Sequence, residues 1–217
     1  MESISTIISF FQEGGLFMYP IVLVLAVGIA IAIERYIYLT AMRSANQRQW
    51  KELMDVLSRH DFQRALGISQ KSKAAIGKIL LYGLERTKSA RRRDDIETAM
   101  EEGLMEIIPR LEKRTHYLAI FANIATLLGL LGTIIGLIQA FTAVGAANPA
   151  EKADMLSASI SVAMNTTAFG LMAAIPLLLI HTVLQTKTTE LVDSLEMATV
   201  KFINIIAESA APKSPAQ

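Results

Sequence analysis

The sequence contains no cysteine among its 217 residues. Disulfides, thiol catalysis and cysteine metal sites are therefore excluded. Two long stretches also lack any charged residue: residues 117–147 and residues 156–184, which are 31 and 29 residues long. Uncharged apolar runs of this length are typical of membrane helices and not of soluble domains, so the missing charge places the chain among membrane proteins.

The common motifs of hydrolytic active sites are absent as well. Neither Gly-x-Ser-x-Gly nor His-Glu-x-x-His occurs, and the two uncharged stretches contain no acid–base pair. An intramembrane enzyme is therefore disfavoured. We predict no catalytic residue, no metal site and no cofactor.

What the chain has in abundance is apolar sequence. Hydrophobic residues make up 52% of it, and its mean hydropathy is +0.39. Both uncharged stretches exceed the roughly 20 residues that a helix needs to cross a bilayer. A third apolar run, residues 16–33, is bordered by Tyr19 at one end and by Arg35 and Tyr36 at the other, as is common at membrane boundaries. The sequence thus predicts three transmembrane helices.

Helical spacing of apolar residues and turn residues divide the rest of the chain. We predict an all-α membrane protein in which the second and third membrane helices extend into the cytoplasm. The predicted segments are an interfacial helix at 1–15, transmembrane helix 1 at 16–39, a cytoplasmic helical domain at 40–93, a long helix with transmembrane helix 2 at 94–147, a periplasmic loop at 148–155, transmembrane helix 3 with its cytoplasmic extension at 156–207, and a disordered tail at 208–217.

Positive charge sets the expected orientation. Residues 34–116 contain 17 Lys and Arg against 12 Asp and Glu, whereas residues 1–33 contain no Lys or Arg. Because basic flanks stay on the cytoplasmic side, we expect the N-terminus outside and the C-terminus inside. The run Arg91-Arg92-Arg93 is better explained as a solvated loop near anionic phospholipid than as a nucleic-acid site.

Small and hydroxyl residues gather on one face of each of the last two membrane helices. Gly129, Gly132 and Gly136 share a face of the second. Ala163, Thr167, Gly170 and Ala174 share a face of the third, with Asn165 and Thr166 beside it, and Thr133 adds a hydroxyl to the second. Such faces serve close helix packing, but hydroxyls can also line an ion path, and the residues alone leave both interpretations open. Pro109 and Pro176 are expected to kink their helices.

An ion path through these helices would lack a titratable group of its own. Proton relays usually use an acidic residue or histidine inside the membrane, and only His181 occurs, near the end of its stretch. If protons pass here, we expect the titrating group to come from another polypeptide. Thr133, Thr166, Thr167 and Asn165 would then form a neutral wall beside it.

Several stretches resemble the MotA/TolQ/ExbB family of bacterial inner-membrane ion-channel subunits, and most of all its three-span ExbB and TolQ branch. They are IER at 33–35, IPRL at 108–111, LLGLLGTIIG at 127–136, TTAFGL at 166–171 and AIP at 174–176. The resemblance implies a homopentamer around a dimeric single-span partner of the ExbD, TolR or MotB type. In it, a membrane aspartate of the partner faces hydroxyls that match Thr133 and Thr167 here.

The resemblance further implies that the proton motive force drives work in the periplasm or at the outer membrane, through a TonB-like protein or a Pal-like, peptidoglycan-linked one. Two departures from the family's pattern bear on this. ExbB proteins often have glutamate at the position of Val162, and the family as a whole often has proline at that of Thr126. The doubled Thr166-Thr167 resembles sodium-driven stators, so a sodium-driven subunit stands as one alternative. A non-conducting membrane scaffold, which needs only the glycine and alanine faces, stands as another.

Overall fold

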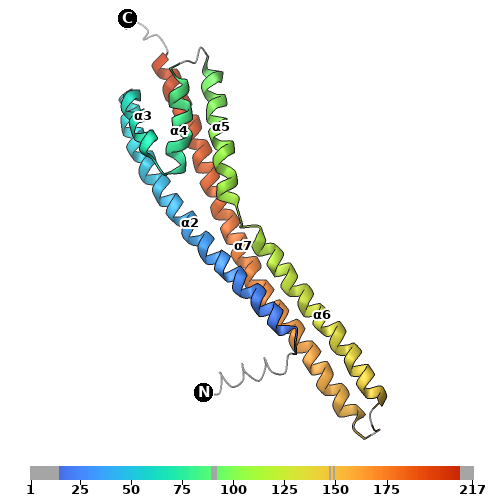
Figure 1. Cartoon of the computed structure of the whole chain (residues 1–217). Coiled ribbons are helices and arrows are strands. Elements are labelled where there is room, and N and C mark those ends of the chain that lie inside the picture. Colours follow the sequence, from blue (N-terminus) through green and yellow to red (C-terminus); the bar gives the residue numbers. More distant parts are fainter. Residues whose placement is uncertain (1–14, 89–91, 147, 149, 211–217) are drawn as a thin grey trace, which may run out of the picture. The chain divides into compact units, whose positions relative to one another are not determined.

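The computed structural model describes residues 15–88, 92–146, 148 and 150–210, and every regular element within them is an α-helix. The all-α prediction is therefore confirmed. The predicted N-terminal helix and most of the predicted tail lie outside the described residues. The helices are α2 (Met18–Ser58), α3 (Phe62–Lys71), α4 (Ala75–Arg86), α5 (Arg93–Glu112), α6 (Tyr117–Ala146) and α7 (Lys152–Ala210) (Figure 1).

Three helical stretches are long and apolar enough to cross a membrane. Their most apolar windows lie in α2, in the stretch of α5 and α6, and in α7, with mean hydropathies of 2.1, 2.2 and 2.0. The prediction of three membrane-length helices is confirmed.

Helix α2 does not end where the first membrane segment was expected to end. The sequence predicts a separate set of short helices over residues 40–93, but residues 40–58 continue α2 without interruption. No proline or glycine occurs between residues 29 and 58, so nothing in the local sequence terminates the helix when its composition changes from apolar to polar.

The predicted continuous helix over residues 94–147 is wrong. Helix α5 ends at Glu112 and α6 begins at Tyr117. Pro109 lies one turn before the end of α5, and its carbonyl accepts the Lys113 N–H at 3.1 Å. Arg114 then takes a φ of 69°, a left-handed conformation that a helix interior does not tolerate.

The third membrane helix is longer at both ends than expected. Helix α7 begins at Lys152, inside the segment predicted as a loop, and continues to Ala210. Pro176 lies within it and does not interrupt it. The connection between α6 and α7 is correspondingly short.

The helices form two compact units. The first, here called the apolar unit, comprises the described parts of Met1–Arg35 together with Arg114–Leu184. The second, the polar unit, comprises the described parts of Tyr36–Lys113 and Gln185–Gln217. Helices α2 and α7 contribute a segment to each unit, whereas α6 belongs to the apolar unit and α3, α4 and α5 to the polar one.

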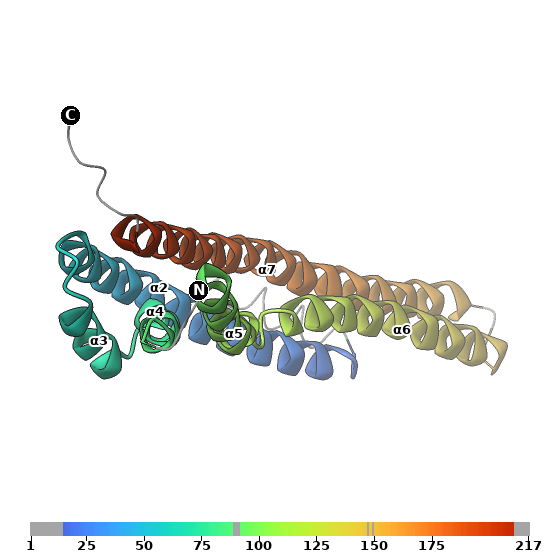
Figure 2. The same ribbon diagram turned by 90° about the horizontal axis from the view of Figure 1, so that it is seen from above.

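Two helices cover α7 in the apolar unit. Helix α6 runs alongside it in both views (Figures 1 and 2). On α2, Gly28 lies against Leu177, so closely that a Cβ at Gly28 would be 2.7 Å from a methyl group of that leucine. The Leu177 side chain can pack this closely against α2 only because Gly28 has no side chain of its own.

In the polar unit, α4 packs between α3 and α5 (Figure 2). Large apolar side chains fill the core, among them the fully buried Ile79, Leu80, Met100 and Phe202. Helix α4 has no capping side chain of its own. Instead, the buried Asn46 of α2 accepts the Ile76 N–H at 3.2 Å, and this bond satisfies one of the free donors in the first turn of α4.

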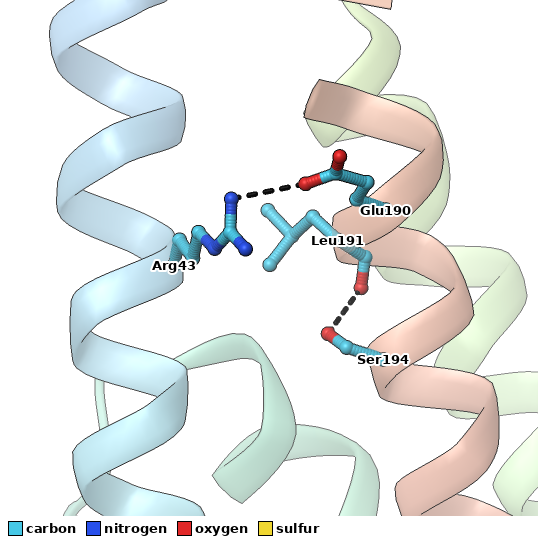
Figure 3. Close-up of polar contacts among 4 residues, drawn as sticks. All are labelled: Arg43, Glu190, Leu191 and Ser194. Carbon is cyan, nitrogen blue, oxygen red and sulfur yellow. Dashed lines mark hydrogen bonds and ion pairs between the residues drawn. The ribbon is translucent and has the colours of Figure 1, made fainter. Parts of the chain in front are cut away.

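An ion pair connects α2 and α7 at the surface of the polar unit. The Arg43 guanidinium donates to Glu190 at 3.0 Å, beside Leu191 and Ser194 of α7 (Figure 3). Both charged side chains are about half exposed, so water screens the pair and its contribution to stability is small.

Candidate functional site

The backbones of α6 and α7 touch along a line of small residues. A Cβ at Gly129 would lie 3.2 Å from the Cα atoms of both Gly170 and Thr167. A Cβ at Gly170 would lie 2.7 Å from the Ala125 carbonyl oxygen. Farther along, a Cβ at Gly136 would lie 3.0 Å from that of Ala163. We call this line of contact the glycine seam.

Two threonine hydroxyls meet across the seam. The Oγ1 atoms of Thr133 on α6 and Thr167 on α7 are 2.8 Å apart. Thr167 also donates to the Gly129 carbonyl at 2.8 Å, and Thr133 lies 2.8 Å from the Leu130 carbonyl. The bond from Thr167 to Gly129 depends on the close approach of the two backbones, so the seam positions this pair.

The structure does not bring Thr166 to the same point. Its side chain is only 2% exposed, and its hydroxyl donates to the Val162 carbonyl at 2.9 Å on its own helix. Its methyl group fills the space that a side chain at Gly132 would need. Thr166 therefore contributes to packing at the seam, while Thr133 and Thr167 present the paired hydroxyls.

Asn165 also lies apart from the pair. Each residue of an α-helix is rotated by about 100° from the previous one, so Asn165 and Thr167 differ by about 200° around α7. The Asn165 side chain is half-buried. The predicted group of four thus separates into a pair at the seam, one packing residue and one residue on another face.

The electrostatics of the seam are set by the lack of charge on α6 and on the apolar part of α7. Each hydroxyl has one hydrogen, and carbonyl oxygens or the partner hydroxyl stand ready to accept both. What the pair can offer to an approaching group is therefore oxygen lone pairs. Such a site favours a hydrogen-bond donor or a cation and gives nothing to an anion.

Two features of the apolar unit were not anticipated from the sequence. Glu34 lies 3.7 Å from the Arg114 guanidinium, 80 residues away in sequence, while its neighbour Arg35 is buried. Gly28 was not singled out, although it gives α2 its close contact with α7. A lone glycine in a membrane helix is a weak sign of packing, and only a partner helix in contact makes it informative.

The sequence profile of the MotA/TolQ/ExbB proton channel family matches residues 71–197, which include the glycine seam and both threonines of the pair. The chain belongs to this family. The resemblance inferred from the sequence motifs is thereby confirmed. The family is one of channel and transport proteins, and the three apolar helices indicate that this chain is a multi-pass membrane protein.

Individual relatives support the assignment. The chain is 28% identical over 186 residues to the biopolymer transport protein ExbB-like 1 of Synechocystis, covering 84% of this chain and 72% of that protein. It is 31% identical over 117 residues to the Tol-Pal system protein TolQ of Haemophilus influenzae, covering 54% of this chain and 51% of that protein.

A solved structure shares the fold. The structure of C. jejuni MotAB superposes with a TM-score of 0.59 at 18% identity, and the match covers 97% of this chain and 88% of that one. At this level of identity the likeness concerns the fold alone.

Proposed function

We propose that this family member is the ion-channel subunit of an energy-transducing motor in the bacterial inner membrane. In this proposal, protons flow past the hydroxyl pair of Thr133 and Thr167 and drive a single-span partner subunit. The observation that carries the proposal is the meeting of the two hydroxyls, 2.8 Å apart, in a unit without charges along the seam.

The chemistry of the pair suits a partner that carries the titrating group. Both threonine hydrogens have acceptors inside the protein, so their oxygens remain to accept a hydrogen bond. A protonated carboxyl group is a donor of this kind, and an ionised one is not. The pair would thus bind the protonated aspartate of the partner and release the ionised form, which couples protonation to movement.

The same geometry favours protons over sodium. Hard cations bind several oxygen ligands at once. The doubled Thr166-Thr167 suggests a larger set of oxygen ligands, but the Thr166 hydroxyl donates within its own helix and lies apart from the pair. A sodium-driven subunit is therefore the second candidate.

The assembly in this proposal contains five copies of the chain around a dimer of an ExbD-, TolR- or MotB-like protein. TolQ and MotAB, to which the chain is similar, are named for systems with further components, and this supports a partner. The work done in the periplasm would pass through a TonB-like or a Pal-like, peptidoglycan-linked protein. The polar unit would lie in the cytoplasm.

The test is proton flux through vesicles that contain the chain and its single-span partner. In the double variant Thr133→Val and Thr167→Val, each hydroxyl is replaced by a methyl group of similar size. We expect flux to fall at least about tenfold, which corresponds to ~1.4 kcal/mol on the barrier. The control is Thr142→Val, which removes an exposed hydroxyl of α6 that donates to the Ile138 carbonyl at 2.8 Å.

The outcomes of this test distinguish the proton path from the two alternatives. Flux that is unchanged in the double variant, with the complex still assembled, would show that the pair does not form the path. A non-conducting scaffold would in addition perform its periplasmic work in the presence of an uncoupler. A flux that requires sodium in place of a proton gradient would select the second candidate.

A further inference from the structure

Helix α5 of the polar unit carries an exposed stripe with one sign of charge. Successive members are three or four residues apart, so they lie on one face of the helix. The stripe, here called the acidic stripe, consists of Asp94, Glu97, Glu101, Met105, Ile108 and Glu112. It contains four acids and no Lys or Arg, and all its members are exposed except the half-buried Ile108.

The acidic stripe is not used by the fold of the polar unit. Helix α5 packs through another face, which bears the buried Ile96, Met100, Gly103 and Ile107. Neighbouring acids of the stripe at i and i+4 repel each other. At its centre, the Met105 side chain is 72% exposed. Such an exposed apolar side chain among like charges is unfavourable in water. It becomes favourable when a partner covers it with an apolar surface and faces the acids with cations.

Helix α3 offers such a surface. A groove of about 440 Å³ lies along α3 and α2. From α3 it is lined by Arg64, Gly67, Ile68 and Lys71, and further by Gln49, Glu52 and Ser72. Helix α3 contains no acid, and its two cations outnumber Glu52. Gly67 is open, because a Cβ there would meet no atom within 4 Å. We call this the basic groove.

The two surfaces do not meet within one chain. Helix α4 packs against both α3 and α5 and lies between them (Figure 2). The acidic stripe points away from α4, because the residues that pack against the core are on another side of α5. A partner with the complementary surface must therefore come from another molecule.

We propose that the acidic stripe docks into the basic groove of a second copy of this chain. Met105 lies over Gly67 and Ile68 of the neighbour, and acids such as Glu101 face Arg64 and Lys71. The proposal rests on the multi-copy assembly of the proposed function and identifies surfaces that hold neighbouring copies together outside the membrane. Charge complementarity between two faces of one chain is the argument for a second copy as occupant.

The symmetry of this contact follows from the surfaces. Stripe and groove are different faces, so each copy uses one to bind its predecessor and the other to bind its successor. Such a head-to-tail contact is heterologous, and it forms a closed ring when the rotation from one copy to the next adds up to a full turn. A two-fold dimer would need stripe and groove on one shared face, so that both contacts form between the same two copies, and here α4 separates them.

Disulfide trapping tests the contact in the full-length complex in native membranes, since the chain has no cysteine of its own. Met105→Cys and Gly67→Cys are introduced into two differently tagged copies and expressed together with the partner. We expect a mixed disulfide between the two tags and little homodimer of either variant. The control pairs Met105→Cys with Gln70→Cys, an exposed residue of α3 that does not line the basic groove.

The outcomes decide the proposal. Mixed dimer above the control supports it, and a ladder of higher species from the double-cysteine chain supports ring closure. Homodimers of Met105→Cys alone, or no mixed dimer from a complex that is still assembled and conducts protons, would overturn the docking and leave the proposed function standing. Conversely, a complex that forms the mixed disulfide but conducts no protons would contradict the proposed function and leave the docking standing.

Charge reversal gives an independent measurement. Glu97→Lys with Glu101→Lys should weaken the mixed disulfide about tenfold, as should Arg64→Glu with Lys71→Glu, because like charges then face each other. All four changes in one chain should restore it. Glu208→Lys, at an exposed site near the end of α7, is the control. Failure of the fourfold variant to recover, while each pair alone weakens the contact, would contradict the proposed pairing.

Discussion

The apolar and polar units hold their helices together by different means. In the apolar unit the contacts are between backbones: Gly129 meets Gly170, and the Thr167 hydroxyl reaches a carbonyl of the neighbouring helix. In the polar unit, large side chains such as Leu80 and Phe202 fill the space between helices. The same chain thus uses small residues in one unit and large ones in the other.

The difference follows from the solvent. In water, burying a large apolar side chain stabilises the fold by a few kcal/mol. In lipid, an apolar side chain gains nothing by leaving the acyl chains, so helices associate through close van der Waals contact and hydrogen bonds. Leu127, Leu130 and Ile138 are accordingly exposed on α6, whereas the leucines Leu53, Leu80 and Leu84 of the polar unit are buried.

The largest expected effect is in the polar unit. Phe202 is fully buried and lies beside Gly83, where a Cβ would be 2.7 Å from its ring. Phe202→Ala leaves a cavity and should destabilise this unit by about 3–5 kcal/mol. Hydrogen exchange should show the loss in α4 and α5 and not along the glycine seam. Met197→Ala, at a 56% exposed site on the same helix, is the matched control.

The next effect should appear in the apolar unit from one added methyl group. Gly170→Ala places a Cβ 2.7 Å from the Ala125 carbonyl oxygen, so α6 and α7 must separate. We expect a loss of about 1–3 kcal/mol in a detergent unfolding assay, typical of overpacking. Gly145→Ala, where no atom lies within 4 Å, should be neutral or stabilising. Equal effects of the two substitutions would contradict the seam as a backbone contact.

The smallest effect concerns a polar contact in water. The Tyr82 hydroxyl donates to Glu106 at 2.6 Å, and this bond, helped by the Arg110 charge, lowers the pKa of the Glu106 carboxyl. Any stability it gives is present at neutral pH and is lost as the pH falls through that lowered pKa. Tyr82→Phe should raise the pKa of Glu106, measurable by NMR titration, with little change in stability.

A matched control sharpens this last measurement. Tyr36→Phe removes another hydroxyl of the polar unit, from a ring that lies under the Lys187 ammonium. It should leave the titration of Glu106 unchanged. If hydroxyls mattered as little in the apolar unit as Tyr82 does in the polar one, replacing Thr133 and Thr167 by valine would leave the proton flux nearly unchanged.

The pattern of apolar residues along the chain predicts much of the fold. Long uncharged runs predict three membrane-length helices, and the structure has them. The break between α5 and α6 was not predictable, because Lys113 to His116 contain neither glycine nor proline, and nothing in residue type foretells the positive φ of Arg114. The continuation of α2 past residue 40 could not be predicted from composition, because the change from apolar to polar residues there is equally typical of the end of a membrane helix.

The site could be anticipated only helix by helix. Spacing places Thr133 and Thr167 each on a small-residue face, but they are 34 residues apart in sequence. Their meeting depends on the register of α6 against α7, which Gly129 and Gly170 set through tertiary contact. For the same reason, spacing alone could not separate Thr166, directed at Gly132, from Thr167 beside it.

The hydrogen bonds of the threonine pair also limit how a proton could travel. Relay along a chain of hydroxyls and waters requires each member to surrender its own hydrogen as it receives another. The Thr167 hydrogen is directed at the Gly129 carbonyl, which has no onward donor, so the sequence of transfers would stop there. In the proposed function, a proton would therefore arrive at the pair and leave it on a mobile carrier, and transport would be stepwise, at most one proton for each visit of that carrier.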